Sequence, residues 1–200
     1  MSPRMPADEK IFLDDGLVVR RATTADLDQV LAVVHDATRR VQEKGFNMWR
    51  LYLTDEGLAQ VRRRLAGAGG EEMYLVVRET DAQPLGAFAV EWSDREIWGD
   101  ARGGDGRAGY VHTLSVHRRA RGTALGERMM KLAEQIIAAR GRDLFRLDCW
   151  RRSEFLRGYY ARLGFAIVAD DVKQGVLMWE KRVAPATAAR PPPPPPNDTP

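Results

Sequence analysis

The sequence has very little of what disulfide frameworks and membrane spans require. Cys149 is the single cysteine among 200 residues, so no internal disulfide can form and a reducing compartment is expected. No stretch approaches the ~18 consecutive apolar residues of a membrane-spanning helix, and the first ten residues are polar rather than signal-like. We therefore expect a cytoplasmic protein with no membrane partner.

The sequence also has no large excess of either charge and no familiar nucleotide-binding motif. The chain has 31 Lys and Arg against 28 Asp and Glu, and a net charge of +3 is too small to indicate a nucleic-acid-binding protein. The pattern G-x-x-x-x-G-K-[ST] is absent, and no G-x-G-x-x-G stands between a strand pattern and a helix pattern. These absences argue against nucleic acid, nucleoside triphosphate and NAD as ligands.

A composition of 44% hydrophobic and 30% charged residues is ordinary for one globular domain. We expect a polar leader at 1–15, a single domain at 16–183 and a disordered, proline-rich tail at 184–200. Apolar spacing predicts strands at 17–21, 73–78, 85–92, 110–116, 144–150, 165–169 and 176–181, and helices at 23–44, 54–65, 125–140 and 153–163. The fold class is α+β with three layers, in which a mixed sheet of about seven strands is flanked by about four helices.

The junction between residues 110–116 and 125–140 is the most informative part of the chain. Strict alternation on the strand places His112 and Leu114 on one face, with Thr113 and Ser115 on the other. The turn that follows is basic and contains small residues where the first N–H groups of the helix are exposed. Such N–H groups, at the positive end of the helix dipole, form an anion site.

The turn reads Arg-Gly-Thr-Ala-Leu-Gly from Arg121 to Gly126. It resembles motif A of the GCN5-related N-acetyltransferases (GNAT), [RQ]-x-x-G-x-[GA], which holds the pyrophosphate of coenzyme A. Ala124 stands where the family has its first glycine. We expect a helical conformation there, which tolerates the additional methyl group but holds the phosphate less closely.

A second resemblance lies at residues 153–165, which are similar to motif B of the family, N-x-x-A-x-x-x-Y-x-x-x-G-F. Tyr160, Gly164 and Phe165 occupy matching positions, whereas Ser153 and Leu156 replace the usual asparagine and alanine. Ser153 is also a favourable helix N-cap, and Gly164 a favourable helix stop.

The resemblance, which spans about residues 17–182, implies the acyl-CoA N-acyltransferase fold, in which the fourth and fifth strands separate to admit the cofactor. It implies transfer of the acetyl group of acetyl-CoA directly to a primary amine of a small molecule or peptide. A non-catalytic module that binds coenzyme A or a small molecule is the alternative, and a basic interaction protein is a third possibility. The expected cofactor-binding residues are Leu114, Ser115, Val116, Arg121, Gly122, Thr123, Ala124, Leu125, Gly126 and Ser153.

The chemistry of amine acetylation requires a proton donor for the leaving thiolate and a proton acceptor for the amine. Tyr160, at the motif position, is the expected general acid because a phenol with a pKa near 10 is protonated at neutral pH. Glu91 and His112, on strands that the family uses to border the acceptor, are the candidate bases, and Asp148 is a weaker third.

The identity of the acceptor is not encoded as clearly. By resemblance, Phe46 and Trp49 are expected on the acceptor side, together with Met48 and Tyr52, although core packing is the better explanation for at least two of these four side chains. Acidic residues of the segment 93–109 are expected in a solvated loop. No metal site is predicted, and a homodimer is possible because the family often forms one.

Overall fold

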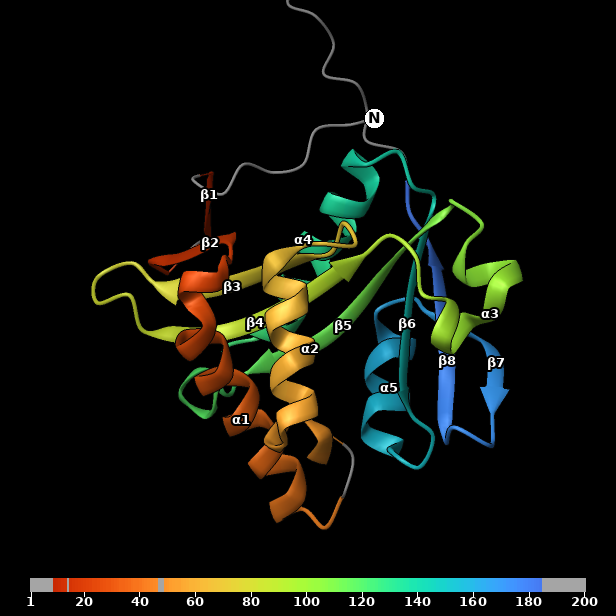
Figure 1. Cartoon of the computed structure of the whole chain (residues 1–200), viewed down its shortest axis with the longest axis horizontal. Coiled ribbons are helices and arrows are strands. Elements are labelled where there is room, and N and C mark those ends of the chain that lie inside the picture. Colours follow the sequence, from red (N-terminus) through yellow and green to blue (C-terminus); the bar gives the residue numbers. More distant parts are fainter. Residues whose placement is uncertain (1–8, 14, 47–48, 185–200) are drawn as a thin grey trace, which may run out of the picture.

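The computed structural model describes residues 9–13, 15–46 and 49–184, and within these ranges the chain is built on one eight-stranded sheet (Figure 1). The strand order is β1-β2-β3-β4-β5-β6-β8-β7, and only β5 and β6 are parallel neighbours. The strands are β1 (Lys10–Leu13), β2 (Leu17–Arg21), β3 (Glu72–Arg78), β4 (Pro84–Glu91), β5 (Ala108–Val116), β6 (Leu144–Trp150), β7 (Ala166–Asp171) and β8 (Val176–Arg182).

Five α-helices surround this sheet in the described ranges: α1 (Leu27–Glu43), α2 (Asp55–Ala66), α3 (Arg95–Gly103), α4 (Leu125–Ala139) and α5 (Glu154–Arg162). Short 3-10 turns, η1 (Thr24–Asp26), η2 (Arg50–Leu53) and η3 (Arg118–Ala120), precede α1, α2 and α4. None of the helices in the described segments has the length and apolarity needed to cross a membrane.

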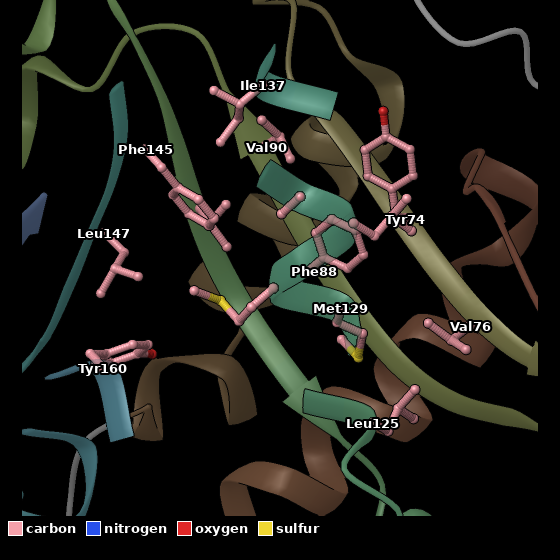
Figure 2. Close-up of a cluster of buried hydrophobic side chains, with 14 of the residues drawn as sticks. Tyr74, Val76, Phe88, Val90, Leu125, Met129, Ile137, Phe145, Leu147 and Tyr160 are labelled. Carbon is pink, nitrogen blue, oxygen red and sulfur yellow. The ribbon is translucent and has the colours of Figure 1, made fainter. Parts of the chain in front are cut away.

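The sheet is the middle of three layers because its side chains alternate between two cores. On β3, Met73, Leu75 and Val77 pack with α1 and α2, whereas Tyr74 and Val76 belong to the core shared with α4 (Figure 2). The predicted three-layer mixed sheet is therefore confirmed, with one more strand and one more helix than expected.

The additional strand lies in the stretch expected to be a polar leader. Lys10–Leu13 forms β1, which pairs antiparallel with β2 at the edge of the sheet. Ile11 and Leu13 pack against the main core, which gives this short segment a reason to be ordered. The rest of the predicted leader up to residue 8, and residues 185–200 of the predicted tail, lie outside the described residues.

The additional helix corrects the prediction of a solvated loop at residues 93–109. Asp94 begins α3 by accepting a hydrogen bond from the N–H of Ile97 at 3.1 Å, and Trp98 is buried against Tyr110 of β5. The pattern Ser-x-x-Glu from Ser93 to Glu96 is a helix-start signal that could have located it. The Gly99 backbone, with φ of +66°, interrupts the helix.

A β-bulge in β5 changes which face of the sheet its later side chains occupy. Ala89 pairs with His112 and Ala87 with Ser115, so Phe88 of β4 lies opposite two residues, Thr113 and Leu114. Val111 and Leu114, three positions apart, therefore pack on the same α4 side of the sheet. The predicted alternation was wrong beyond residue 112 because the extra residue places His112 and Leu114 on opposite faces.

Candidate active site

The parallel strands β5 and β6 pair over only three residues. Their register runs from Ala108 and Leu144 to Tyr110 and Arg146, and from there the two strands diverge toward their carboxyl ends (Figure 1). We call residues 111–116 of β5 and 147–150 of β6 the splayed segment. It is the separation that the family resemblance implied, and it leaves the facing edges of the two strands without mutual register partners in the described chain.

The start of α4 lies directly after the splayed segment of β5 and presents main-chain donors. The first hydrogen bonds of α4 run from the N–H groups of Glu127 and Arg128 to the carbonyl of Ala124. The N–H groups of Leu125 and Gly126 therefore precede the hydrogen-bond ladder of a 15-residue helix. Together with the helix dipole, these donors have an arrangement that favours an anion, and the cofactor-binding role of residues 121–126 stays a prediction.

Ala124 does not have the helical conformation that we expected. Its φ is +55° and its ψ +17°, a left-handed backbone immediately before α4. This conformation costs a residue with a Cβ about 1–2 kcal/mol relative to the right-handed region, and glycine avoids the cost. The glycine of the family pattern thus corresponds to a left-handed turn, and the alanine here forms the same turn under strain.

Helix α1 fixes the end of β5 and the beginning of this turn. Asp36 accepts a hydrogen bond of 2.8 Å from the N–H of Arg118 and pairs with its guanidinium. Burial alone would raise the pKa of Asp36, but the hydrogen bonds from Arg118 outweigh it and the pKa lies below its usual value. Arg40 donates to the carbonyl of Val116 at 2.8 Å, so this predicted cofactor contact already has a side-chain partner.

His112 lies between two carboxylates from different elements. Its Nε2 is 3.4 Å from Oδ2 of Asp94, and its Nδ1 is 3.8 Å from Oδ1 of Asp148 on β6. Burial lowers the pKa of His112, but Asp94, Glu91 and Asp148 together outweigh this effect and Arg64, so the pKa is raised above 6.5. An imidazole with two carboxylates on opposite edges is suited to hold a proton that it has accepted.

The two carboxylates beside His112 differ in their own protonation. Burial raises the pKa of Asp94, but His112, the N–H of Ile97 and Arg64 outweigh it, so the net pKa is lowered. For Asp148, burial is the largest effect and the nearby charge of Asp94 adds to it, so its pKa is raised. Asp94 is therefore the carboxylate that is charged and stabilises the imidazolium, a role the sequence analysis missed because it expected Asp94 in solvent.

Glu91 is not placed as a free base. Its Oε1 accepts a hydrogen bond of 2.7 Å from Nε of Arg64, whose side chain is only 5% exposed. The Glu91 carboxylate is thus already engaged by the opposite charge of Arg64. The charge of Glu91 contributes to the raised pKa of His112, but its carboxylate is hydrogen-bonded to Arg64.

Tyr160 lies on the other side of the sheet from His112. It packs in the core shared by α4, β6 and α5, and Figure 2 shows it at the margin of that cluster near Leu147, with its hydroxyl directed toward the side of β5. Burial raises the pKa of Tyr160, and the charge of Asp148 raises it further. Tyr160 lies near Leu147 of the splayed segment, to which His112 also belongs.

Tyr159 and Ser153 complete the helix that carries Tyr160. Ser153 caps α5 by accepting a hydrogen bond of 3.2 Å from the N–H of Leu156, as predicted, and its hydroxyl is thereby occupied. Tyr159 points elsewhere than Tyr160: its hydroxyl would lie 3.1 Å from a Cβ placed on Gly126. Burial raises the pKa of Tyr159 to about 12, so it remains protonated beside the start of α4.

On the acceptor side, the predicted aromatic residues form two edge-to-face pairs. The rings of Phe46 and Trp150 are 4.9 Å apart, which connects the end of α1 to the end of β6. Trp49 packs on Tyr52 of η2 at 5.7 Å. Phe46 and Trp49 therefore lie near the α1 and α2 side of the splayed segment, and Met48 lies outside the described residues.

Asp94, His112 and Asp148 are also the group of potential metal ligands that the described segments bring within 4.8 Å of one another. Their arrangement favours proton chemistry, because the two carboxylates approach different ring nitrogens, whereas a metal ion would bind one nitrogen and both carboxylates at a common point.

Comparison with known proteins agrees with this architecture. The model of the acetyltransferase (GNAT) family matches residues 38–165, well over half of the chain and including both motifs. The chain belongs to the GNAT family. An uncharacterised N-acetyltransferase, YesJ of Bacillus subtilis (strain 168), is 26% identical over 180 residues, which cover 88% of this chain and 95% of YesJ.

Other GNAT relatives support the same fold. Glucosamine 6-phosphate N-acetyltransferase 1 of Oryza sativa subsp. japonica is 31% identical over 126 residues, covering 62% of this chain and 70% of that protein. A GNAT acetyltransferase from Listeria monocytogenes 4b F2365 superposes with a TM-score of 0.71 at 24% identity, over 87% of this chain and 99% of that one. PaiA N-acetyltransferase from Thermoplasma acidophilum, solved in complex with coenzyme A, gives a TM-score of 0.66 at 12% identity, over 83% and 98% of the two chains.

Proposed function

We propose that this protein transfers the acetyl group of acetyl-CoA directly to a primary amine of a small molecule or peptide. The observation that carries the proposal is the separation of β5 from β6, with His112 3.8 Å from Asp148 on one face of the sheet and Tyr160 in the core on the other face. An amine that approaches from the α1 and α2 side would meet the base, and a thioester that approaches from the α4 and α5 side would meet the acid.

The residues present fit coenzyme A. The N–H groups at the start of α4 and the exposed Arg121 suit the pyrophosphate, because guanidinium and main-chain donors both bind phosphate oxygens. The edge of β5 from Leu114 to Val116 offers main-chain groups for the amides of the pantetheine arm. When bound, acetyl-CoA supplies a thioester carbonyl as the acyl donor.

His112 is the general base of this proposal. A free alkyl ammonium has a pKa near 10.4, so less than about one part in a thousand is neutral at pH 7 and its proton must be accepted. The raised pKa of His112 makes the imidazole a stronger acceptor than free histidine, and Asp94 stabilises the resulting positive charge. Glu91, the other candidate, is a weaker choice because Arg64 occupies it.

Tyr160 is the general acid. The raised pKa of Tyr160 keeps its hydroxyl protonated at any working pH, so the proton is available to the leaving sulfur. Because a phenolate would be unfavourable in this buried position, we expect the hydroxyl to act mainly by a hydrogen bond that strengthens as negative charge develops on the sulfur.

The experiment is thiol release from acetyl-CoA, followed in the presence of a panel of small amines, amino acids and peptides. We expect at least one amine to release thiol with formation of its acetamide, and we expect His112→Gln to lower kcat by about 10²-fold or more. His35→Gln, a half-buried histidine on α1, is the matched control and should retain activity. Retention on coenzyme A resin without thiol release from any amine would favour the non-catalytic module.

A further inference from the structure

Arg64 of α2 is the most deeply buried guanidinium beside the candidate site. Only 4% of the residue is exposed, and it donates to three different elements. Besides Glu91 of β4, it contacts Tyr52 of η2 at 3.1 Å and Oγ1 of Thr113 of β5 at 2.7 Å. Tyr52 and Thr113 share a further hydrogen bond of 2.8 Å, so the three side chains form a closed network. We call Arg64, Tyr52 and Thr113 the bulge clamp.

Thr113 is the residue of β5 that needs such support. Its φ of +55° lies in the left-handed region, which is unusual for any residue with a Cβ and most unusual for a β-branched one. Such conformations persist only where the surroundings hold them. The clamp holds the Thr113 side chain, and the hydroxyl of Ser115 donates to the Thr113 carbonyl at 2.9 Å, which holds its main chain.

Stability alone does not explain an arginine at this position. A buried ion pair must offset a large desolvation penalty, and well-packed apolar residues of similar volume are often at least as stabilising. A guanidinium, however, presents several donors in a fixed plane, which a lysine cannot reproduce. Here the guanidinium donates to Glu91, Tyr52 and Thr113 at once. It therefore connects α2 to the bulge of β5, which places His112 and Leu114 on opposite faces of the sheet.

We propose that Arg64 is a positioning residue, which acts through Thr113 to hold the β5 bulge in the geometry that acetyl transfer requires. The bulge sets two directions at once: that of the His112 side chain toward the acceptor face, and that of the main chain from Leu114 to Val116 along the cofactor edge. This proposal rests on the proposed acetyl transfer.

The positive charge of Arg64 also affects the pKa of His112, and this effect can be tested separately from the hydrogen bonds that hold Thr113. The groups that face His112 are Glu91 from β4, Asp94 from the segment before α3, Asp148 from β6 and Arg64 from α2. The carboxylates raise the pKa of His112, and Arg64 lowers it. Removal of the positive charge at residue 64 should therefore raise the pKa of His112, whereas a lysine that keeps the charge should change it less.

The test compares Arg64→Lys, Arg64→Met and Thr113→Val with Arg63→Met, the adjacent and largely exposed arginine of α2. We expect the first three to lower kcat by about 10²-fold, since small misplacements of reacting groups have effects of this size. The KM for acetyl-CoA should change far less. The acidic limb of the pH profile should move to higher pH in Arg64→Met only, and Arg63→Met should behave as the wild type.

Amide hydrogen exchange of residues 112–116 tests the clamp without any activity. We expect faster exchange in Arg64→Lys and Thr113→Val than in Arg63→Met, with the thermal transition of Thr113→Val retained as a sign of folding. The proposal would be overturned by unchanged exchange in Arg64→Lys and Thr113→Val, or by a kcat of both variants within about twofold of the wild type. If the wild type acetylates no amine, the proposed function fails, and the exchange experiment still decides on the clamp.

Discussion

Replacement of Ala124 by glycine should stabilise the protein, although glycine in a helix interior usually destabilises it. The left-handed backbone of Ala124 costs about 1–2 kcal/mol, and a glycine would remove this cost from the folded state. Against it stands about 0.4–1 kcal/mol of additional unfolded-state entropy. The net effect lies between about 0 and 1.6 kcal/mol, and its centre is a gain of about 0.8 kcal/mol, or about 2–3 °C in Tm for a chain of this size.

The assay is urea unfolding of Ala124→Gly beside Ala139→Gly. Ala139 is an exposed residue in the last turn of the same helix, with ordinary helical geometry, so the same substitution there should cost up to about 1 kcal/mol. The two variants should therefore shift the midpoint in opposite directions. A midpoint lowered equally by both would refute the assignment of strain to Ala124.

The same variant separates strain from affinity. The left-handed backbone of Ala124 belongs to the turn itself, so we assign its cost to folding rather than to binding. We expect the dissociation constant for coenzyme A to change by less than about twofold in Ala124→Gly. A much tighter complex would show instead that the methyl group itself holds the phosphate away.

Three further predictions concern the acid, the base and the packing of α2. Tyr160→Phe should lower kcat by about 10²-fold or more with saturating acetyl-CoA, and full turnover would remove the hydroxyl from the mechanism. The pKa of His112 is raised above 6.5 and the base must be neutral, so kcat/KM should rise with pH along a limb that lies above pH 6.5. Asp94→Asn removes a group that raises this pKa and should move the limb to lower pH. A limb that does not move would exclude the pair of His112 and Asp94 from the mechanism. Gly57→Ala should destabilise the protein by about 2 kcal/mol or more, because its Cβ would lie 2.2 Å from the Leu51 carbonyl oxygen, whereas Gly158→Ala on α5, with only the end of a flexible arginine nearby, should be tolerated in the same thermal melt.

The regular elements were predictable because their signals are local. The apolar spacing of α4 and the alternation of β3 depend on neighbours three or two residues apart, and the helix stops at Gly141 and Gly164 require a positive φ that glycine favours. The order of strands in the sheet and the separation of β5 from β6 depend on long-range pairing. The separation was predicted only through the family resemblance of residues 121–126 and 153–165, and the strand order was not predicted.

The polar partners in the candidate site were less predictable because they come from distant segments. Asp94 reaches His112 because the N-cap position of α3 lies beside β5, a contact that no local pattern specifies. Arg64 is one of three consecutive arginines, Arg62 to Arg64, and only helical spacing, which places it on the face of Val61 and Leu65, distinguishes it from the other two. Its burial follows from the rotation of α2 about its axis, which the apolar contacts of Val61 and Leu65 fix against α1 and β3.

The bulge at Thr113 had no sequence signal, since threonine is a good strand residue and neither glycine nor asparagine marks the left-handed position. Yet this one inserted residue decides how the strand can serve two reactants. With strict alternation, His112, Leu114 and Val116 would all lie on the same face of the sheet. A base on the α1 and α2 face would then place Leu114 and Val116 on that face as well. The phase change instead turns Leu114 and Val116 into the core beside α4 and leaves His112 with Asp94 and Asp148 on the opposite face. A strand therefore needs local strain at this point to present a base on one side and pack its cofactor edge on the other, and a buried polar clamp is the physical means of holding that strain.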